Sequence, residues 1–148
     1  LKVPGDLGHL FRGDLLDEET GAAIAEWVNG RKPVDHALEL LRRAMRLNPC
    51  CPDRYLWHLA DAQLTLERPE EVVATVRRMR DPSQGRRMLA ASYAHLGMLE
   101  EAGAEARAIL ELQPGFTVAD WARRPPYRNP ARLEYFLEGL RRAGLPER

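Results

Sequence analysis

The sequence predicts an all-α fold, a helical solenoid in which antiparallel helix pairs stack in a row and a last helix caps the C-terminal end. Its clearest unit is residues 83–114, where small and apolar residues recur at helical spacing on both sides of a glycine turn. These residues are Leu89, Ala90, Tyr93, Gly97, Leu99, Ala102, Ala106, Ile109 and Pro114. Because one helix pair cannot bury its apolar face alone, we expect about three such repeats, at residues 17–49, 53–82 and 83–114.

The first repeat begins with a predicted helix over residues 18–28, in which we expect Ile24, Ala25 and Val28 to face inward. Asn29 and Gly30 supply the turn that follows. A second helix over residues 33–47 then places four residues on one stripe, namely Ala37, Leu41, Ala44 and Leu47. Residues 1–16 form an N-terminal extension to which the pattern assigns no structure.

In the second repeat, Asp53 is the expected N-cap of a helix that carries an inward-facing set of Leu56, Leu59, Ala60 and Gln63. Pro69 suits the first position of the next helix, whose inward residues are Val72, Val76 and Met79. Asp81 and Pro82 stop this helix about one 3.6-residue turn early. We therefore expect the third repeat to lie slightly out of register with the second.

Residues 115–148 predict a partial fourth repeat and a cap. A short helix over residues 117–124 carries Val118 and Trp121, and Pro125 and Pro126 prevent its continuation. Asn129 and Pro130 then start an amphipathic helix that ends near Gly144 and whose apolar face is formed by Leu133, Phe136, Leu137 and Leu140. A solenoid exposes its last apolar face, and this helix is suited to cover it.

The composition argues against several classes of function. Twenty-two Lys and Arg balance twenty-two Asp and Glu, so no global field attracts nucleic acid or an anionic membrane. No apolar run reaches the length of a membrane span and residues 1–16 lack a leader pattern, so we expect a cytoplasmic protein. A start at Leu1 is compatible with a fragment of a longer polypeptide. The four histidines and two cysteines lack metal-ligand spacing and no nucleophile or phosphate-loop motif occurs, so we expect no metal, no cofactor and no enzyme activity.

The chain from Ala37 onward resembles the C-terminal tetratricopeptide (TPR) region attached to bacterial class III adenylate/guanylate cyclases and to some winged-helix regulators. The segments that carry the resemblance are 41–49 (LRRAMRLNP), 93–97 (YAHLG), 99–102 (LEEA), 126–130 (PYRNP) and 140–146 (LRRAGLP). Two positions depart from the TPR pattern: Arg86 stands where an aromatic residue is common, and Glu67 replaces the turn glycine. The resemblance implies a non-catalytic protein-interaction or scaffold module, regulatory within a signalling protein whose catalysis lies elsewhere.

In TPR arrays the first helix of each pair lines the concave surface, so the resemblance also implies a candidate groove. The positions that would face it are Arg54, Trp57, Asp61, Leu64 and Thr65 in the second repeat, with Gln84, Arg87, Ala91, Ala94 and His95 in the third. Trp57 beside Arg54 and Arg87 has the composition of an interface hot spot, with guanidinium groups able to grip a peptide carboxylate. Equally, Trp57 could pack against a neighbouring helix as ordinary core.

Two other interpretations remain open. The repeats could mediate self-association into a homodimer through an uncovered apolar face at the N-terminal end, where no obvious helix precedes Glu18. Nucleic acid could bind an arginine-rich surface formed by Arg123, Arg124, Arg128, Arg132, Arg141 and Arg142, with Trp121, Tyr127 and Tyr135 interleaved. Asp120, Glu134 and Glu138 dilute that surface, which disfavours the nucleic-acid interpretation.

Overall fold

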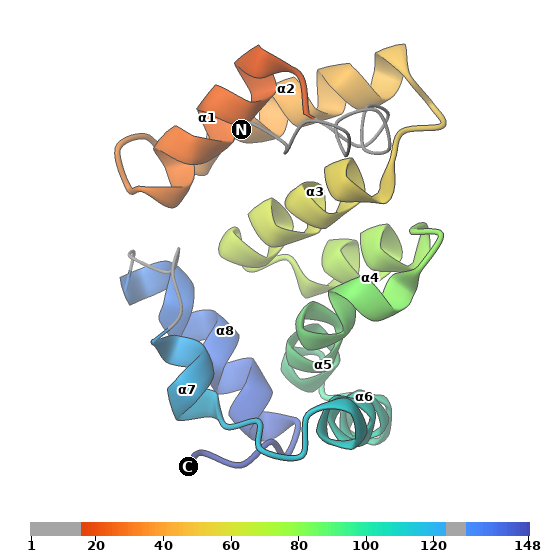
Figure 1. The fold of residues 1–148 in the computed structure, drawn as a ribbon, viewed down its shortest axis with the longest axis vertical. Helices are drawn as coiled ribbons and strands as arrows, with labels where there is room; N and C mark the ends of the chain where they lie inside the picture. Colours follow the sequence, from red (N-terminus) through yellow and green to blue (C-terminus); the bar gives the residue numbers. More distant parts are fainter. Residues whose placement is uncertain (1–15, 124–129) are drawn as a thin grey trace, which may run out of the picture.

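The computed structural model describes residues 16–123 and 130–148, with side chains from residue 133 onward in the second range. These described residues are helical and contain no strand (Figure 1). The all-α class predicted from the sequence is thus confirmed. The elements are α1 (Glu18–Val28), α2 (Val34–Leu47), α3 (Asp53–Thr65), α4 (Pro69–Arg77), the 3-10 turn η2 (Pro82–Gly85), α5 (Arg86–His95), α6 (Leu99–Leu112), α7 (Val118–Ala122) and α8 (Pro130–Arg142). Within these residues, no helix combines the length and apolarity needed to cross a bilayer.

Helices α1 to α6 pack against one another in chain order, each touching the helix before it and the helix after it (Figure 1). The chain then reverses, because α7 leads into α8, which runs back beside α5. Helix α8 packs mainly on α5 and reaches α3, so it lies across the first helices of two successive pairs. The apolar pattern of this helix predicts that it covers the end of the array, but it does not predict which helices it contacts.

Helices α1, α3, α5 and α8 all end in the same hydrogen-bonded turn. After α1, the amide of Gly30 donates to the carbonyl of Trp27 at 2.9 Å, and the same bond recurs at Glu67, Gly97 and Gly144. The residue that donates this bond adopts a positive φ in each case: 73° at Gly30, 56° at Glu67, 77° at Gly97 and 100° at Gly144. Glycine reaches this region without strain, which explains three of the four residue choices.

The start of α3 differs from the prediction. Asp53 is the first helical residue and Pro52 is the N-cap, so Asp53 is not the cap that the sequence suggested. Its carboxylate instead accepts hydrogen bonds from two later amides, Arg80 N at 2.7 Å and Asp81 N at 2.9 Å. These bonds tie the beginning of α3 to the segment after α4, where the chain stops being helical before Pro82 as predicted.

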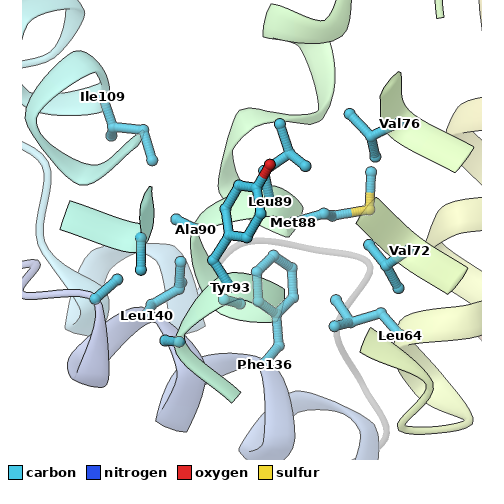
Figure 2. Close-up of a cluster of buried hydrophobic side chains, with 14 of the residues drawn as sticks. Leu64, Val72, Val76, Met88, Leu89, Ala90, Tyr93, Ile109, Phe136 and Leu140 are labelled. Carbon is cyan, nitrogen blue, oxygen red and sulfur yellow. The ribbon is translucent and has the colours of Figure 1, made fainter. Parts of the chain in front are cut away.

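The core consists of two clusters of buried side chains. The larger draws on α3 to α8, and Figure 2 shows Tyr93 of α5 between the valines of α4 and the apolar face of α8 that includes Phe136 and Leu140. The smaller joins α1 and α2 to one side of α3 through Leu59 and Ala62. Helix α3 therefore belongs to both clusters, which is why Leu56, Leu59, Ala60, Ala62 and Leu64 are all buried.

Three residues expected in the core lie at the surface. Ala25 is exposed because α1 packs on α2 with the stripe Thr20, Ala23, Ile24 and Trp27, one position out of the predicted register. Leu47 is 77% exposed at the last turn of α2, and Leu99 is 59% exposed at the first residue of α6. Helix α7 is also shorter than predicted: it spans five residues, with Thr117 as its N-cap.

Candidate binding groove

Two adjoining hollows lie along α3 and share Arg54 and His58 in their linings. The first, about 650 Å³, lies between α1 and α3. The second, about 560 Å³, lies between the start of α3 and the segment from Arg80 to Gln84. We call them together the α3 groove, lined by Leu16, Asp17, Glu18, Gly21, Ala22, Ile24, Ala25, Val28, Asn29, Pro52, Asp53, Arg54, Trp57, His58, Arg80 and Gln84.

The first hollow follows from how the first helices pack. Helix α1 packs chiefly on α2, and α2 in turn packs on α3, so α1 and α3 face each other across open space. The wall contributed by α1 carries no side chain at Gly21 and only methyl groups at Ala22 and Ala25, which do not fill that space. The apolar residues Leu16 and Val28 complete this wall.

Trp57 is half-buried and forms the wall between the second hollow and the core. Its indole Nε1 donates a hydrogen bond to the carbonyl of Gln84 at 3.2 Å, which fixes the ring between α3 and η2. The imidazole of His58 meets the indole edge to face, with ring centroids 5.2 Å apart. Trp57 therefore packs against its neighbours, as one of the two alternatives predicted, and it also borders the groove.

Two of the three carboxylates that line the groove, those of Asp17 and Asp53, are engaged by the protein itself. Asp17 caps α1: its Oδ1 accepts from Thr20 N at 2.8 Å and its Oδ2 from Thr20 Oγ1 at 2.8 Å. Partial burial is the largest single influence and raises the pKa of Asp17, but these hydrogen bonds together outweigh it and lower the pKa below its ordinary value. Asp53 is held by the two amides described above.

The arginines of the groove are exposed, and neither Arg54 nor Arg80 forms an ion pair among the residues that the structure describes. Arg54 borders both hollows, whereas Arg80 borders only the second. Two guanidinium groups with unused donors thus flank an aromatic wall.

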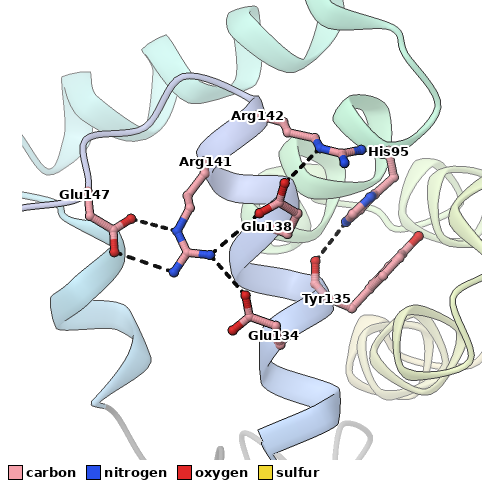
Figure 3. A network of polar contacts seen from close by, with 7 residues as sticks. All are labelled: His95, Glu134, Tyr135, Glu138, Arg141, Arg142 and Glu147. Atoms are coloured by element: carbon pink, nitrogen blue, oxygen red, sulfur yellow. Dashed lines mark hydrogen bonds and ion pairs between the residues drawn. The ribbon is translucent and has the colours of Figure 1, made fainter.

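Helix α8 covers the part of the predicted concave surface that belongs to α5. Ala91 and Ala94 are buried, and the His95 imidazole stacks on Tyr135 of α8 with ring centroids 3.8 Å apart. Nε2 of His95 also lies 2.8 Å from the carbonyl oxygen of Tyr135, as Figure 3 shows. His95 therefore joins α5 to α8 instead of facing open space.

Three more of the predicted site residues lie outside the groove. Asp61 is buried, and its carbonyl accepts a hydrogen bond from Thr65 Oγ1 at 3.0 Å. The guanidinium carbon of Arg87 lies 4.6 Å from the ring centroid of Trp121, and its Nη2 donates to Gln113 Oε1 at 2.9 Å. The structure thus separates Arg87 from the Trp57 hollow, because the aromatic rings near α7 attract its side chain.

Of the ten positions predicted to face the concave surface, the structure brings together Arg54, Trp57 and Gln84 in one hollow. It adds His58 and Arg80, which are not among the predicted positions. His58 is adjacent to Trp57 in sequence, and it borders both the opening between α1 and α3 and the second hollow. Arg80 lies in the segment that the sequence marked only as a helix stop, and Asp53 holds the backbone of that segment beside α3.

Three arginines of the predicted arginine-rich surface have described side chains, and all three are paired with acids. Arg141 contacts Glu134, Glu138 and Glu147, and Arg142 contacts Glu138 (Figure 3). Arg123 pairs with Asp120. Arg124, Tyr127 and Arg128 and the side chain of Arg132 lie outside the described residues. Residues 1–15, which precede the N-terminal face of the self-association interpretation, lie outside them too.

A comparison with known protein families, curated proteins and solved structures found no match to this chain. Its function therefore has to be argued from its own residues. Among the described residues, no cluster of three His, Cys, Asp or Glu side chains is placed to hold a metal ion.

Proposed function

We propose that the chain is a TPR-like helical module that binds a peptide segment of a partner protein in the α3 groove. In this proposal the module has no catalytic role and acts in the cytoplasm as a scaffold or regulatory part of a larger signalling system. The observation that carries the proposal is the pair of adjoining hollows that share Arg54 and His58. Concave sites with an aromatic wall and a few convergent polar groups are typical of binding sites.

The repeat part of the proposal is supported by helix ends that recur. Helices α1, α3 and α5, the first helices of the three pairs, share the turn with a positive φ described above. The second helices α2 and α6 end alike too: φ and ψ are −136° and 85° at Asn48, and −135° and 79° at Gln113. Each of these residues precedes a proline, which favours such extended backbone. Copies of one repeated unit are expected to end their corresponding helices in the same backbone conformation.

Small residues at the helix crossings support the same proposal. Ala37, Ala60, Ala90 and Ala102 are completely buried. Paired helices approach to about 8–10 Å only where the side chains between them are small. Ala44, which the sequence places on the same stripe as Ala37, is only partly buried.

The binding part of the proposal rests on what α8 leaves open. Since α8 covers Ala91, Ala94 and His95, the surface formed by the first helices remains accessible only toward α1 and α3. The groove that remains is bordered by apolar residues of α1 at one end and by Trp57 with two arginines at the other. An extended or helical segment of a few residues fits such a site.

The test is to select binders from a library of random twelve-residue peptides on the immobilised chain and to measure the selected peptides by fluorescence anisotropy. Ala25→Trp fills the first hollow from an exposed position of α1, and Ala104→Trp makes the same change at an exposed position of α6 outside the groove. We expect Ala25→Trp to weaken binding at least tenfold and Ala104→Trp to leave it unchanged. Peptides whose affinity neither substitution changes would contradict the assignment of the groove as the binding site.

Self-association is distinguished by light scattering across a concentration series. A monomer at all concentrations agrees with a module that awaits a foreign segment. A dimer that Ala25→Trp dissociates would mean that a second copy of the chain occupies the groove, and a dimer that it leaves intact would place the contact elsewhere.

A further inference from the structure

Three carboxylates and two arginines line the α3 groove. Asp17 and Asp53 use their carboxylate oxygens to accept hydrogen bonds from the protein, and Glu18 borders the hollow beside α1. Arg54 and Arg80 have no ion-pair partner in the described parts of the chain, although Arg141 pairs with Glu134, Glu138 and Glu147 (Figure 3). The second hollow contains neither Asp17 nor Glu18, so its two guanidinium groups face one carboxylate, that of Asp53, which two backbone amides already engage.

The two ends of the groove differ in polarity. Toward α1 the lining includes Ala22, Ala25 and Val28, which offer apolar surface and no hydrogen-bonding side chain. Toward η2 it includes Trp57 with Arg54 and Arg80. Arg54 borders both hollows, so a ligand that contacts it lies within reach of both ends.

We propose that the segment bound here carries an Asp or Glu side chain that pairs with Arg54 and Arg80, next to an aliphatic side chain that enters the hollow between α1 and α3. This inference rests on the proposed function and names the chemistry of its ligand. Guanidinium groups pair with carboxylates through two parallel N–H donors. A dianionic phosphate is less well suited, because Glu18, Asp17 and Asp53 also line the groove and repel a doubly charged group more strongly.

The experiment uses the random twelve-residue library on the full chain and counts residues in the peptides whose binding Ala25→Trp abolishes. We expect Asp or Glu to be enriched within about four residues of Leu, Ile or Val. The double variant Arg54→Glu/Arg80→Glu should weaken those peptides at least tenfold and select Lys or Arg instead. The matched control Arg42→Glu/Arg46→Glu changes the net charge equally at exposed positions of α2 outside the groove, and should leave affinity within twofold.

The salt dependence of peptide affinity is a second readout, and a purely structural role of these arginines would not produce it. Affinity of the acidic peptides should fall as NaCl rises from about 0.05 to 0.5 M, because screening weakens exposed ion pairs. Arg54→Gln/Arg80→Gln, a milder change, should remove most of that salt dependence without altering the melting temperature. Groove-dependent peptides that lack acidic enrichment would overturn this inference and leave the proposed function standing. A library that yields no groove-dependent peptide would overturn both.

Discussion

Gly139→Ala tests whether α8 crosses α5 as closely as the structure places it. A methyl carbon at position 139 would lie 2.7 Å from Ala91 Cβ and 2.8 Å from both the Cα and the carbonyl oxygen of Ala91. Two of these three atoms belong to the backbone, so no side-chain rotation relieves the overlap, and α8 must move away from α5. The substitution therefore probes the one contact that decides which part of the concave surface is covered.

The expected change in the free energy of unfolding follows from two opposing effects. Replacing a glycine inside a helix with alanine stabilises that helix by about 1 kcal/mol. Overpacking a close contact destabilises the fold by about 1–3 kcal/mol, and the upper end applies here because the overlap involves backbone. The net expectation is a loss of about 2 kcal/mol in the free energy of unfolding. For a chain of this length that corresponds to a melting temperature lower by about 4–8 °C.

The assay is thermal and urea unfolding followed by helical circular dichroism, with Gly103→Ala as the matched control. A methyl carbon at Gly103 of α6 would meet only the flexible end of Arg107, at 3.4 Å. This control should therefore raise stability by up to about 1 kcal/mol, since only the propensity gain remains. A Gly139→Ala chain as stable as the unmodified protein would refute the close crossing, and with it the argument that α8 covers the α5 part of the surface.

Four further substitutions have expected outcomes in the same unfolding assay. Glu67→Gly should stabilise the chain by about 1 kcal/mol, because Glu67 has a φ of 56° and a side chain disfavours that region; a loss would contradict this. Leu41→Ala should cost about 2–5 kcal/mol and Leu47→Ala less than about 0.5, since Leu41 is fully buried and Leu47 is 77% exposed. Asp17→Ala should cost about 1 kcal/mol at pH 7 through the lost cap. The lowered pKa of Asp17 makes this contribution complete above the ordinary value of 3.8, and it should disappear as the pH falls through the folded-state value.

The candidate site was predictable only in part. Repeat positions selected Arg54, Trp57 and Gln84, which share one hollow, because these residues lie on the groove side of α3 and η2. The same positions also selected Arg87 and His95, whose side chains bind Trp121 and Tyr135 in elements far along the chain. A repeat pattern describes contacts between neighbouring helices, and it contains no information on a later helix that folds back over them.

By itself the sequence determined most of the points where helices begin and end. Local chemistry sets those points: Asp17 caps α1, Pro69 starts α4, and glycines at positions 30, 97 and 144 allow the turns that end three helices. Apolar spacing also determined most of the core, including Leu41, Val72, Val76 and Leu140.

Only the tertiary structure decided which faces are covered and which stay open. Ala25 and Ile24 are neighbours with similar apolar character, yet Ala25 is exposed and Ile24 is buried, because α1 packs on α2 and not on α3. Helix α8 lies against α5 because Gly139 lets the two backbones approach at Ala91, a contact between residues 48 positions apart. Burial depends on how well surfaces from distant parts of the chain pack together. A local apolar pattern shows which residues can be buried, but it does not show which elements will cover them.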